Sequence, residues 1–172
     1  VGGQGKEMMD GLTITVATSW EQVEEYAAAS ATCIGPSKAN WADAKKSWEQ
    51  DKPQPIYVLL DHRGRKGYVR FLPVAGFLWS DFFTMADHLI KDNAKYHTEI
   101  WLEAMRFLGQ PCLLNHNSYG GRAIKWLGPT LSYKRVNSYP YNGASIWVLY
   151  PEDIGGQSKD LHPSPQAPYF DC

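Results

Sequence analysis

The stretch that decides the fold is IYVLLDHRGRKGYVRFL, which runs from Ile56 to Leu72. Two apolar arms, 56–60 and 67–72, flank a polar centre that contains Gly64 and ends at Gly67. Apolar runs of strand length on either side of a glycine-bearing polar stretch are typical of a β-hairpin. The first arm is apolar on both of its faces, as in a strand inside a sheet. We therefore predict a hairpin with a central first strand and a tight, basic turn around the two glycines.

Outward from this hairpin, strand and helix patterns alternate. Apolar alternation predicts a strand at 12–17. Apolar residues recur at helical spacing in the segment after residue 19 and at 39–50, 78–91 and 97–108. The apolar segments 130–136 and 145–150 predict a closing hairpin. The order is roughly βααββααββ, which predicts an α+β fold with a mainly antiparallel sheet and helices packed on one face.

The start of the first helix carries a capping pattern. Thr18 and Ser19 precede Glu21 and Gln22, respectively, by three residues. In a capping box the hydroxyl accepts a hydrogen bond from the main chain three residues on, and the Glu or Gln side chain accepts one in return. We therefore predict that Thr18 or Ser19 caps this helix.

Composition and charge limit the class of protein. The 172 residues are 44% hydrophobic and 20% charged, with a net charge of −1. This predicts one globular domain over 1–150, followed by an irregular tail rich in Pro and Gly at 151–172. A nearly neutral chain has no overall attraction to nucleic acid or anionic lipid, and no apolar run has the length of a membrane span. We expect a soluble protein with no membrane partner.

The cysteines indicate a compartment. Cys33, Cys112 and Cys172 are odd in number, widely spaced and without a Cys-x-x-Cys pair. A disulfide framework needs paired cysteines in an oxidising environment. We therefore expect a cytoplasmic location, with Cys172 as a free, exposed thiol.

Four residues raise the question of a metal site. His97 and Glu99 form a His-x-Glu pair at a helix start, and Cys112 and His116 follow. A zinc deaminase combines such a pair with two thiolates one turn apart, but Cys112 has no partner three residues away. We therefore favour no metal and predict no cofactor. In the alternative, a metal-dependent hydrolase or deaminase-like enzyme, His97, Cys112 and His116 would hold zinc and Glu99 would move a proton.

Cys112 also belongs to a second catalytic alternative. It could act as a nucleophile, with His116 or His162 as the base and Asn115 as the orienting group. A reactive cysteine normally has an electropositive, partly exposed environment. Because Cys112 follows Pro111 and begins an apolar run, we predict a buried hydrophobe instead.

Basic and aromatic residues gather in two segments. The hairpin turn carries Arg63, Arg65, Lys66 and Arg70, and the second segment carries Arg122, Lys125, Trp126, Tyr133, Lys134 and Arg135. Basic groups neutralise phosphates, and aromatic rings stack on exposed bases. They could equally be ordinary solvated surface groups. If the two segments share a face, they predict a binding domain for single-stranded nucleic acid or a protein partner.

Two resemblances bear on origin. The stretches SATCIG, NWADAKKSW and IYVLLDHRGRKGYVRF lie within residues 13–90, which resemble a small Thr-Trp-Cys-type domain of bacteriophage and mobile-element proteins. Thr32 stands where that domain has tryptophan. The resemblance implies a phage-associated protein in the host cytoplasm or the virion. A structural virion component is a third functional alternative.

The second resemblance covers residues 56–120. The order of hairpin, His-x-Glu helix and CLLNHN is similar to that of bacterial deaminase toxins, without their paired cysteines. It implies a relative that has lost the metal or replaced its ligands.

Overall fold

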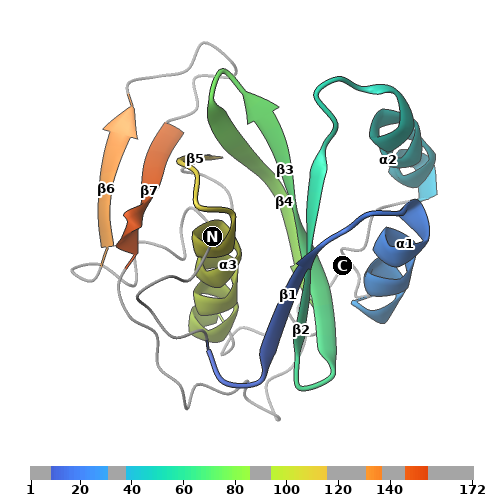
Figure 1. Ribbon diagram of the computed structural model, residues 1–172, viewed down its shortest axis with the longest axis horizontal. Helices are drawn as coiled ribbons and strands as arrows, with labels where there is room; N and C mark the ends of the chain where they lie inside the picture. The colour runs from blue at the N-terminus through green and yellow to red at the C-terminus, as the bar shows by residue number, and fades with distance from the viewer. Residues whose placement is uncertain (1–8, 31–37, 86–93, 116–130, 137–145, 155–172) are drawn as a thin grey trace.

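The described residues form a mixed sheet of seven strands, around which the helices pack (Figure 1). The computed structural model describes residues 9–30, 38–85, 94–115, 131–136 and 146–154. Along the chain the elements are β1 (Leu12–Val16), α1 (Trp20–Ala29), α2 (Lys38–Gln50), β2 (Ile56–His62), β3 (Arg65–Val74), β4 (Phe77–Met85), α3 (Ala94–Leu108), β5 (Cys112–Asn115), β6 (Leu131–Val136) and β7 (Ile146–Ile154). The strand order is β1-β2-β3-β4-β5-β7-β6, and only the β4–β5 pair is parallel. The predicted α+β class with a mainly antiparallel sheet is confirmed.

The central hairpin is β2 and β3, as predicted. Its last pair is His62 with Arg65, so Arg63 and Gly64 form a two-residue turn. Their φ angles are 55° and 89°, as the primed turns of tight hairpins require. Gly67 lies inside β3 rather than in the turn. It permits close approach of β4, since a Cβ there would lie 2.2 Å from the carbonyl oxygen of Thr84.

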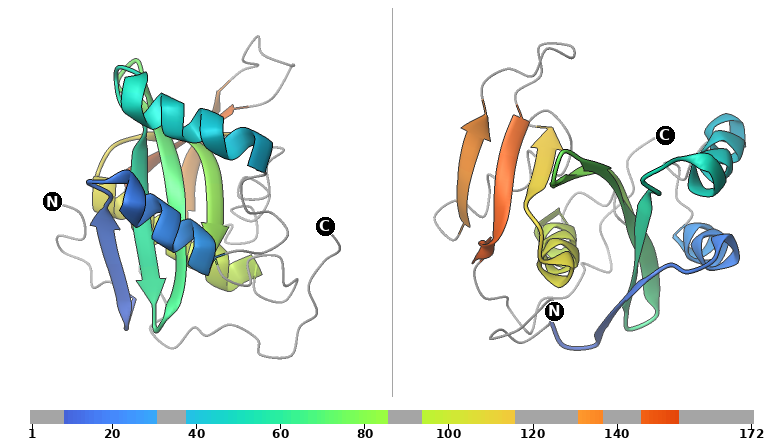
Figure 2. Two further views of the ribbon diagram at one scale, coloured as in Figure 1. Left: turned by 90° about the vertical axis from the view of Figure 1, so that its right-hand side faces the viewer. Right: turned by 45° about the horizontal axis from the view of Figure 1, so that its top comes forward.

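Helices cover both faces of the sheet, whereas the sequence analysis expected them on one face. The α3 side of the core includes Val58, Leu60 and Val69, and the α1 and α2 side includes Tyr57 and Leu59. Strand β2 thus sends alternate apolar side chains into two cores. Figure 2 shows α1 and α2 together on one side and α3 on the other. The physical reason is the doubly apolar β2 arm, which requires cover on both faces.

The helix predicted at 78–91 is wrong for the first part of that segment, which is a strand. Strand β4 occupies Phe77–Met85. Its pairing with β3 shifts between Arg70 and Phe71, so Asp81 is an extra residue in β4. Such a bulge breaks strict alternation, because the apolar residues that face α3 move from even to odd positions. Leu78 lies before the bulge and Met85 after it, and their separation of seven residues is that of two helical turns.

The first helix is capped as predicted. The Ser19 hydroxyl accepts a hydrogen bond from the Gln22 main-chain N–H at 3.3 Å. The Gln22 side-chain oxygen accepts one from the Thr18 main-chain N–H at 2.8 Å. Trp20, Val23 and Ala27 are then buried against the sheet.

The last part of the sheet is the predicted closing hairpin, β6 and β7, which pair antiparallel. Strand β7 continues to Ile154, into the segment expected to be irregular. The rest of the tail, 155–172, lies outside the described residues. Among the helices that the structure describes, none has the length and apolar character to cross a membrane.

Candidate functional site

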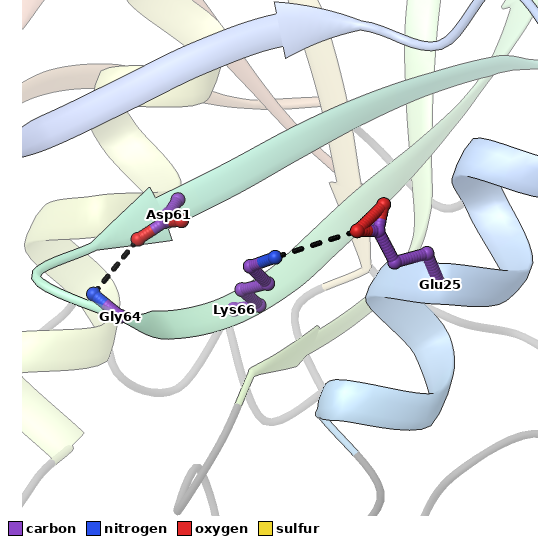
Figure 3. A network of polar contacts seen from close by, with 4 residues as sticks. All are labelled: Glu25, Asp61, Gly64 and Lys66. Atoms are coloured by element: carbon purple, nitrogen blue, oxygen red, sulfur yellow. Dashed lines mark hydrogen bonds and ion pairs between the residues drawn. The ribbon is translucent and has the colours of Figure 1, made fainter.

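The basic turn is partly committed to contacts within the protein. The Lys66 ammonium lies 3.6 Å from a Glu25 carboxylate oxygen and 5.0 Å from the centre of the Tyr26 ring, both on α1 (Figure 3). The Asp61 carboxylate closes the turn by accepting a hydrogen bond from the Gly64 N–H at 2.9 Å (Figure 3). Lys66 therefore ties the hairpin to α1 rather than pointing freely into solvent.

Arg63, Arg65 and Arg70 are the other predicted contact residues of the hairpin. Arg63 is exposed, and its side chain passes over Gly11, where an added Cβ would lie 2.9 Å from the Arg63 Cγ. Arg65 and Arg70 are half-buried. Fewer basic side chains of this hairpin are exposed than the sequence implied.

The structure does not bring the two basic segments together. Tyr133, Lys134 and Arg135 lie in β6, at one edge of the sheet, whereas the hairpin lies near the other edge. Three strands separate β3 from β6, which puts roughly 20 Å between them at ordinary strand spacing. Arg122, Lys125 and Trp126 lie outside the described residues. A single platform made from both segments is therefore not formed by the described parts.

The His-x-Glu pair begins α3, and Cys112 lies beyond the other end of that helix. His97 and Glu99 belong to α3, and Glu99 is buried. About 16 Å of helix separates His97 from Leu108, after which the chain reaches Cys112. His116 lies outside the described residues. Within the described ranges, no three His, Cys, Asp or Glu residues gather as a metal would require.

Cys112 is fully buried in the core beside α3. Burial raises the pKa of its thiol to about 12. A nucleophilic cysteine needs a lowered pKa and access to substrate, so Cys112 lacks the environment of a nucleophile. The predicted buried hydrophobe is confirmed.

Helix α3 carries a cluster of buried charges that was not predicted from the sequence. Glu99, Glu103 and Arg106 are all less than a tenth exposed, and Arg106 forms an ion pair with Glu103. Glu103 also accepts a hydrogen bond from the Met9 N–H at 3.1 Å. Burial lowers the pKa of Arg106, and nearby Glu99 opposes that shift. Their spacing along one side of α3 was visible in the sequence, but nothing there showed that this side is covered.

A second internal polar group joins the N-terminal segment, the hairpin and α3. The buried His62 Nδ1 lies 2.5 Å from the Tyr96 hydroxyl, and its Nε2 lies 2.9 Å from the Asp10 carbonyl oxygen. Since a carbonyl only accepts, Nε2 carries the proton and Nδ1 accepts from Tyr96. This contact places the start of α3 at the hairpin end of the sheet, which is also where β4 ends.

The most distinctive feature of the sheet is the separation of its two parallel strands. Strands β4 and β5 pair only at Leu78 with Cys112 and at Trp79 with Leu113. Beyond Trp79, β4 continues to Met85, and no described strand pairs with it on its β5 side. The bulge at Asp81 lies just past the last pair. Bulges are over-represented next to active sites.

Helix α3 lies beneath this separation. The Trp101 indole N–H donates to the Ser80 hydroxyl at 3.0 Å, and the Trp101 ring is stacked with Phe83 at 6.3 Å between ring centres. Trp101 thus contacts β4 on both sides of the bulge, and α3 also contacts β7 on the far side of β5. In Figure 2, right, α3 lies under the strands where β5 and β4 part. The α3 face of the sheet is therefore covered at the place where the strands part.

Comparison with known proteins adds little to this geometry. No protein-family model matches the chain, and no curated protein matches it. Among solved structures, the ribosomal-protein-S18-alanine N-acetyltransferase from Escherichia coli is similar, with a TM-score of 0.45 and 15% identity over 88% of this chain and 99% of that chain. A likeness at this level carries no argument about what this chain does. The phage and deaminase-toxin resemblances stay predictions.

Proposed function

We propose that the chain binds a coenzyme A thioester, with its extended arm between β4 and β5. One observation carries the proposal: these strands pair at two positions and then part, while β4 continues past a bulge. Main-chain groups around Ser80, where the strands part, are suited to an extended chain that bears amides. The arm of coenzyme A is such a chain. Because coenzyme A carries acyl groups, the proposal places this protein among acyl-transferring enzymes.

The closed α3 face favours this arm over a peptide strand. A peptide in an extended conformation presents side chains alternately to both faces of the sheet. On one face those side chains would meet Trp101, which is only 3% exposed and packed against β4. The arm of coenzyme A carries no side chains on its amide-bearing middle section. It therefore suits a position at which α3 covers one face of the sheet.

The start of α3 favours a ligand with phosphates. The helix begins at Ala94, at the same end of the sheet as the end of β4, and its first turn has no acidic residue. Unpaired N–H groups and the helix dipole make such a terminus favourable for anions. A ligand with phosphates near Ala94 and an arm directed toward Ser80 satisfies both features.

Titration calorimetry with acetyl coenzyme A tests the proposal, together with amide hydrogen exchange in the complex. We expect saturable binding, and slower exchange of the Ser80, Asp81 and Phe82 amides than in the free protein. The comparison probe is an extended peptide rich in valine. The absence of binding at about 1 mM ligand, an affinity weaker than about −4 kcal/mol, would overturn the proposal. Tighter binding of the peptide would do the same.

A second candidate is binding of single-stranded nucleic acid at the hairpin alone. Exposed Arg63 beside half-buried Arg65 and Arg70 favours it. Removing one cation that binds a phosphate should lower the slope of log affinity against log salt by about 1. The double change Arg63→Glu/Arg65→Glu should therefore flatten the salt dependence of retention on single-stranded DNA. The control is Lys45→Glu/Lys46→Glu on exposed positions of α2, and an equal effect of both variants would contradict a hairpin site.

A further inference from the structure

Strand β1 forms one edge of the sheet, and among the described strands only β2 pairs with it. Its sequence, Leu-Thr-Ile-Thr-Val, contains no charged residue and no proline. The opposite edge, β6, carries Lys134 and Arg135, and its pairing with β7 is irregular between Leu131 and Tyr133. Charges and irregular pairing of this kind keep an edge strand from pairing with another chain. Strand β1 lacks these protective features.

Two hydrogen bonds that flank the β1–β2 pairing show which main-chain groups of β1 face outward. The Arg63 N–H donates to the Gly11 carbonyl at 3.3 Å, and the Ala17 N–H donates to the Tyr57 carbonyl at 2.9 Å. Hydrogen-bonded pairs alternate along an antiparallel ladder. The odd-numbered residues of β1 therefore bond to β2, and the even-numbered residues direct their N–H and carbonyl groups away from it.

The even-numbered residues of β1 are Leu12, Ile14 and Val16. The Leu12 N–H donates back to the Met9 carbonyl at 3.1 Å, so Leu12 offers its carbonyl to another strand. Leu12 and Ile14 are buried, whereas Val16 is 41% exposed. The end of β1 thus combines an exposed apolar side chain with main-chain groups directed away from the sheet.

We propose that β1 pairs antiparallel with β1 of a second copy of this chain, about a two-fold axis at Ile14. Ile14 then exchanges hydrogen bonds with the partner's Ile14, and the Val16 N–H donates to the partner's Leu12 carbonyl. The Val16 side chain lies opposite the partner's Leu12, and exposed Thr13 lies opposite the partner's Thr15. Apolar pairs and threonine pairs across strands are both favourable. The strand is therefore complementary to itself, as a two-fold interface requires.

Charges near the two ends of β1 favour a second copy over an unrelated strand. Arg63 is exposed, and its side chain passes over Gly11, just before β1. Glu21 is exposed in the first turn of α1, which follows β1 along the chain. Antiparallel pairing brings the start of one β1 to the end of the other. Arg63 then comes near the partner's Glu21, and the symmetry repeats this attraction at the other end.

The size of the contact sets its strength. A pair of five-residue strands buries less than the roughly 1,200 Å² of a stable interface. We therefore expect a weak, concentration-dependent dimer, with a dissociation constant on the order of 10–100 µM.

Sedimentation equilibrium of the full chain, at concentrations up to about 500 µM, tests the pairing. Val16→Pro removes an outward N–H from each copy and leaves the β1–β2 ladder intact, so the dissociation constant should rise about tenfold or more. The matched control is Val74→Ala, which removes another exposed valine at the β3–β4 turn and should leave the dimer unchanged. A monomer throughout this range would overturn the proposal. A dimer that Val16→Pro leaves equally tight would also overturn it.

A charge exchange tests the two-fold arrangement without changing β1. Arg63→Glu and Glu21→Arg should each raise the dissociation constant by about fivefold, because each places like charges together at both ends of the interface. The double variant should return to within about twofold of the unaltered protein. This test applies even if Val16→Pro fails to fold, as judged by its unfolding transition. A double variant no tighter than the single ones would contradict the arrangement.

Amide hydrogen exchange at low and high protein concentration locates the contact. Exchange at Ile14 and Val16 should slow as the dimer forms, because these N–H groups gain partners. Exchange at Thr13 and Thr15, whose N–H groups face β2, should change much less. Dimer formation with no slowing at Ile14 and Val16 would show that a different surface associates.

Discussion

At the scale of single residues, the most informative group is the buried pair of His62 and Tyr96. Tyr96 is 2% exposed, and its hydroxyl donates to the imidazole of His62, which in turn donates to the Asp10 carbonyl. Three segments far apart in the sequence meet through this chain of hydrogen bonds. Buried polar groups of this kind stabilise a fold only while each one keeps its partner.

The pH dependence of stability tests this pair. Burial raises the pKa of Tyr96 to about 12 from its ordinary 10.0, and the charges of Arg65 and Arg63 partly oppose the rise. Folding thus favours the protonated phenol. Its contribution to the free energy of unfolding is fully present below about pH 10 and is lost between about pH 10 and 12.

We expect Tyr96→Phe to lower the free energy of unfolding by about 1–3 kcal/mol at neutral pH, because His62 loses its donor. Above about pH 10, the phenol of the unaltered protein ionises in the unfolded state but stays protonated in the folded state, which favours unfolding. Tyr96→Phe has no phenol to ionise. The difference in the free energy of unfolding between the unaltered protein and Tyr96→Phe should therefore narrow by up to roughly 2–3 kcal/mol. Urea unfolding of both proteins at increasing pH measures this difference. A difference that stays constant through about pH 11.5 would contradict the assigned environment of Tyr96.

At the scale of elements, α3 has the most unusual composition of its buried surface. It packs Ile100, Trp101 and Met105 into the core and also buries Glu103 and Arg106. Taking either charge away leaves the other buried without its ion-pair partner, which costs about 3–5 kcal/mol, whereas replacing both by apolar residues costs far less. The pair therefore constrains how α3 packs more than it adds to stability.

A double-mutant cycle tests this role. Arg106→Met and Glu103→Leu should each lower the free energy of unfolding by about 3 kcal/mol, and the double variant should lose much less than the sum. Chemical denaturation of the four proteins gives the coupling energy. Because Glu99 remains beside Arg106, the Glu103→Leu loss should be the smaller of the two. Additive losses would show that the ion pair does not act as a unit.

The elements also show what the sequence could and could not predict. The β2–β3 hairpin, the Ser19 cap and α3 depend on local spacing and turn chemistry, and all three were predictable. Strand β4 was not, because the bulge at Asp81 moves its apolar residues from one alternation to the other. Cover on both faces could have been inferred from β2 alone, since its alternate residues are apolar on both sides.

At the scale of the whole molecule, the candidate site lies where two parts of the sheet join. Strands β1 to β4 form one antiparallel part and β5, β7 and β6 the other, and among the described residues the two parts pair at two positions, both between β4 and β5. No local pattern indicates this junction, because 26 residues, with α3 among them, separate the end of β4 at Met85 from the start of β5 at Cys112. The basic residues attracted attention through composition, yet the sheet places the hairpin and β6 far apart. Which basic residues share a face depends on pairing between distant segments, which local patterns do not indicate.

Ligand binding at that junction should stabilise the whole molecule, because a ligand held by both β4 and β5 braces the weakest connection in the sheet. At a free concentration about 100 times its dissociation constant, acetyl coenzyme A adds about 2.7 kcal/mol to the free energy of unfolding. For a chain of this size that corresponds to a rise in the thermal midpoint of roughly 5–10 °C. Scanning calorimetry with increasing ligand measures the shift, and inorganic phosphate at equal concentration is the control. An equal shift with phosphate would mean that only the α3 terminus binds, and an unchanged midpoint would remove the site between the strands.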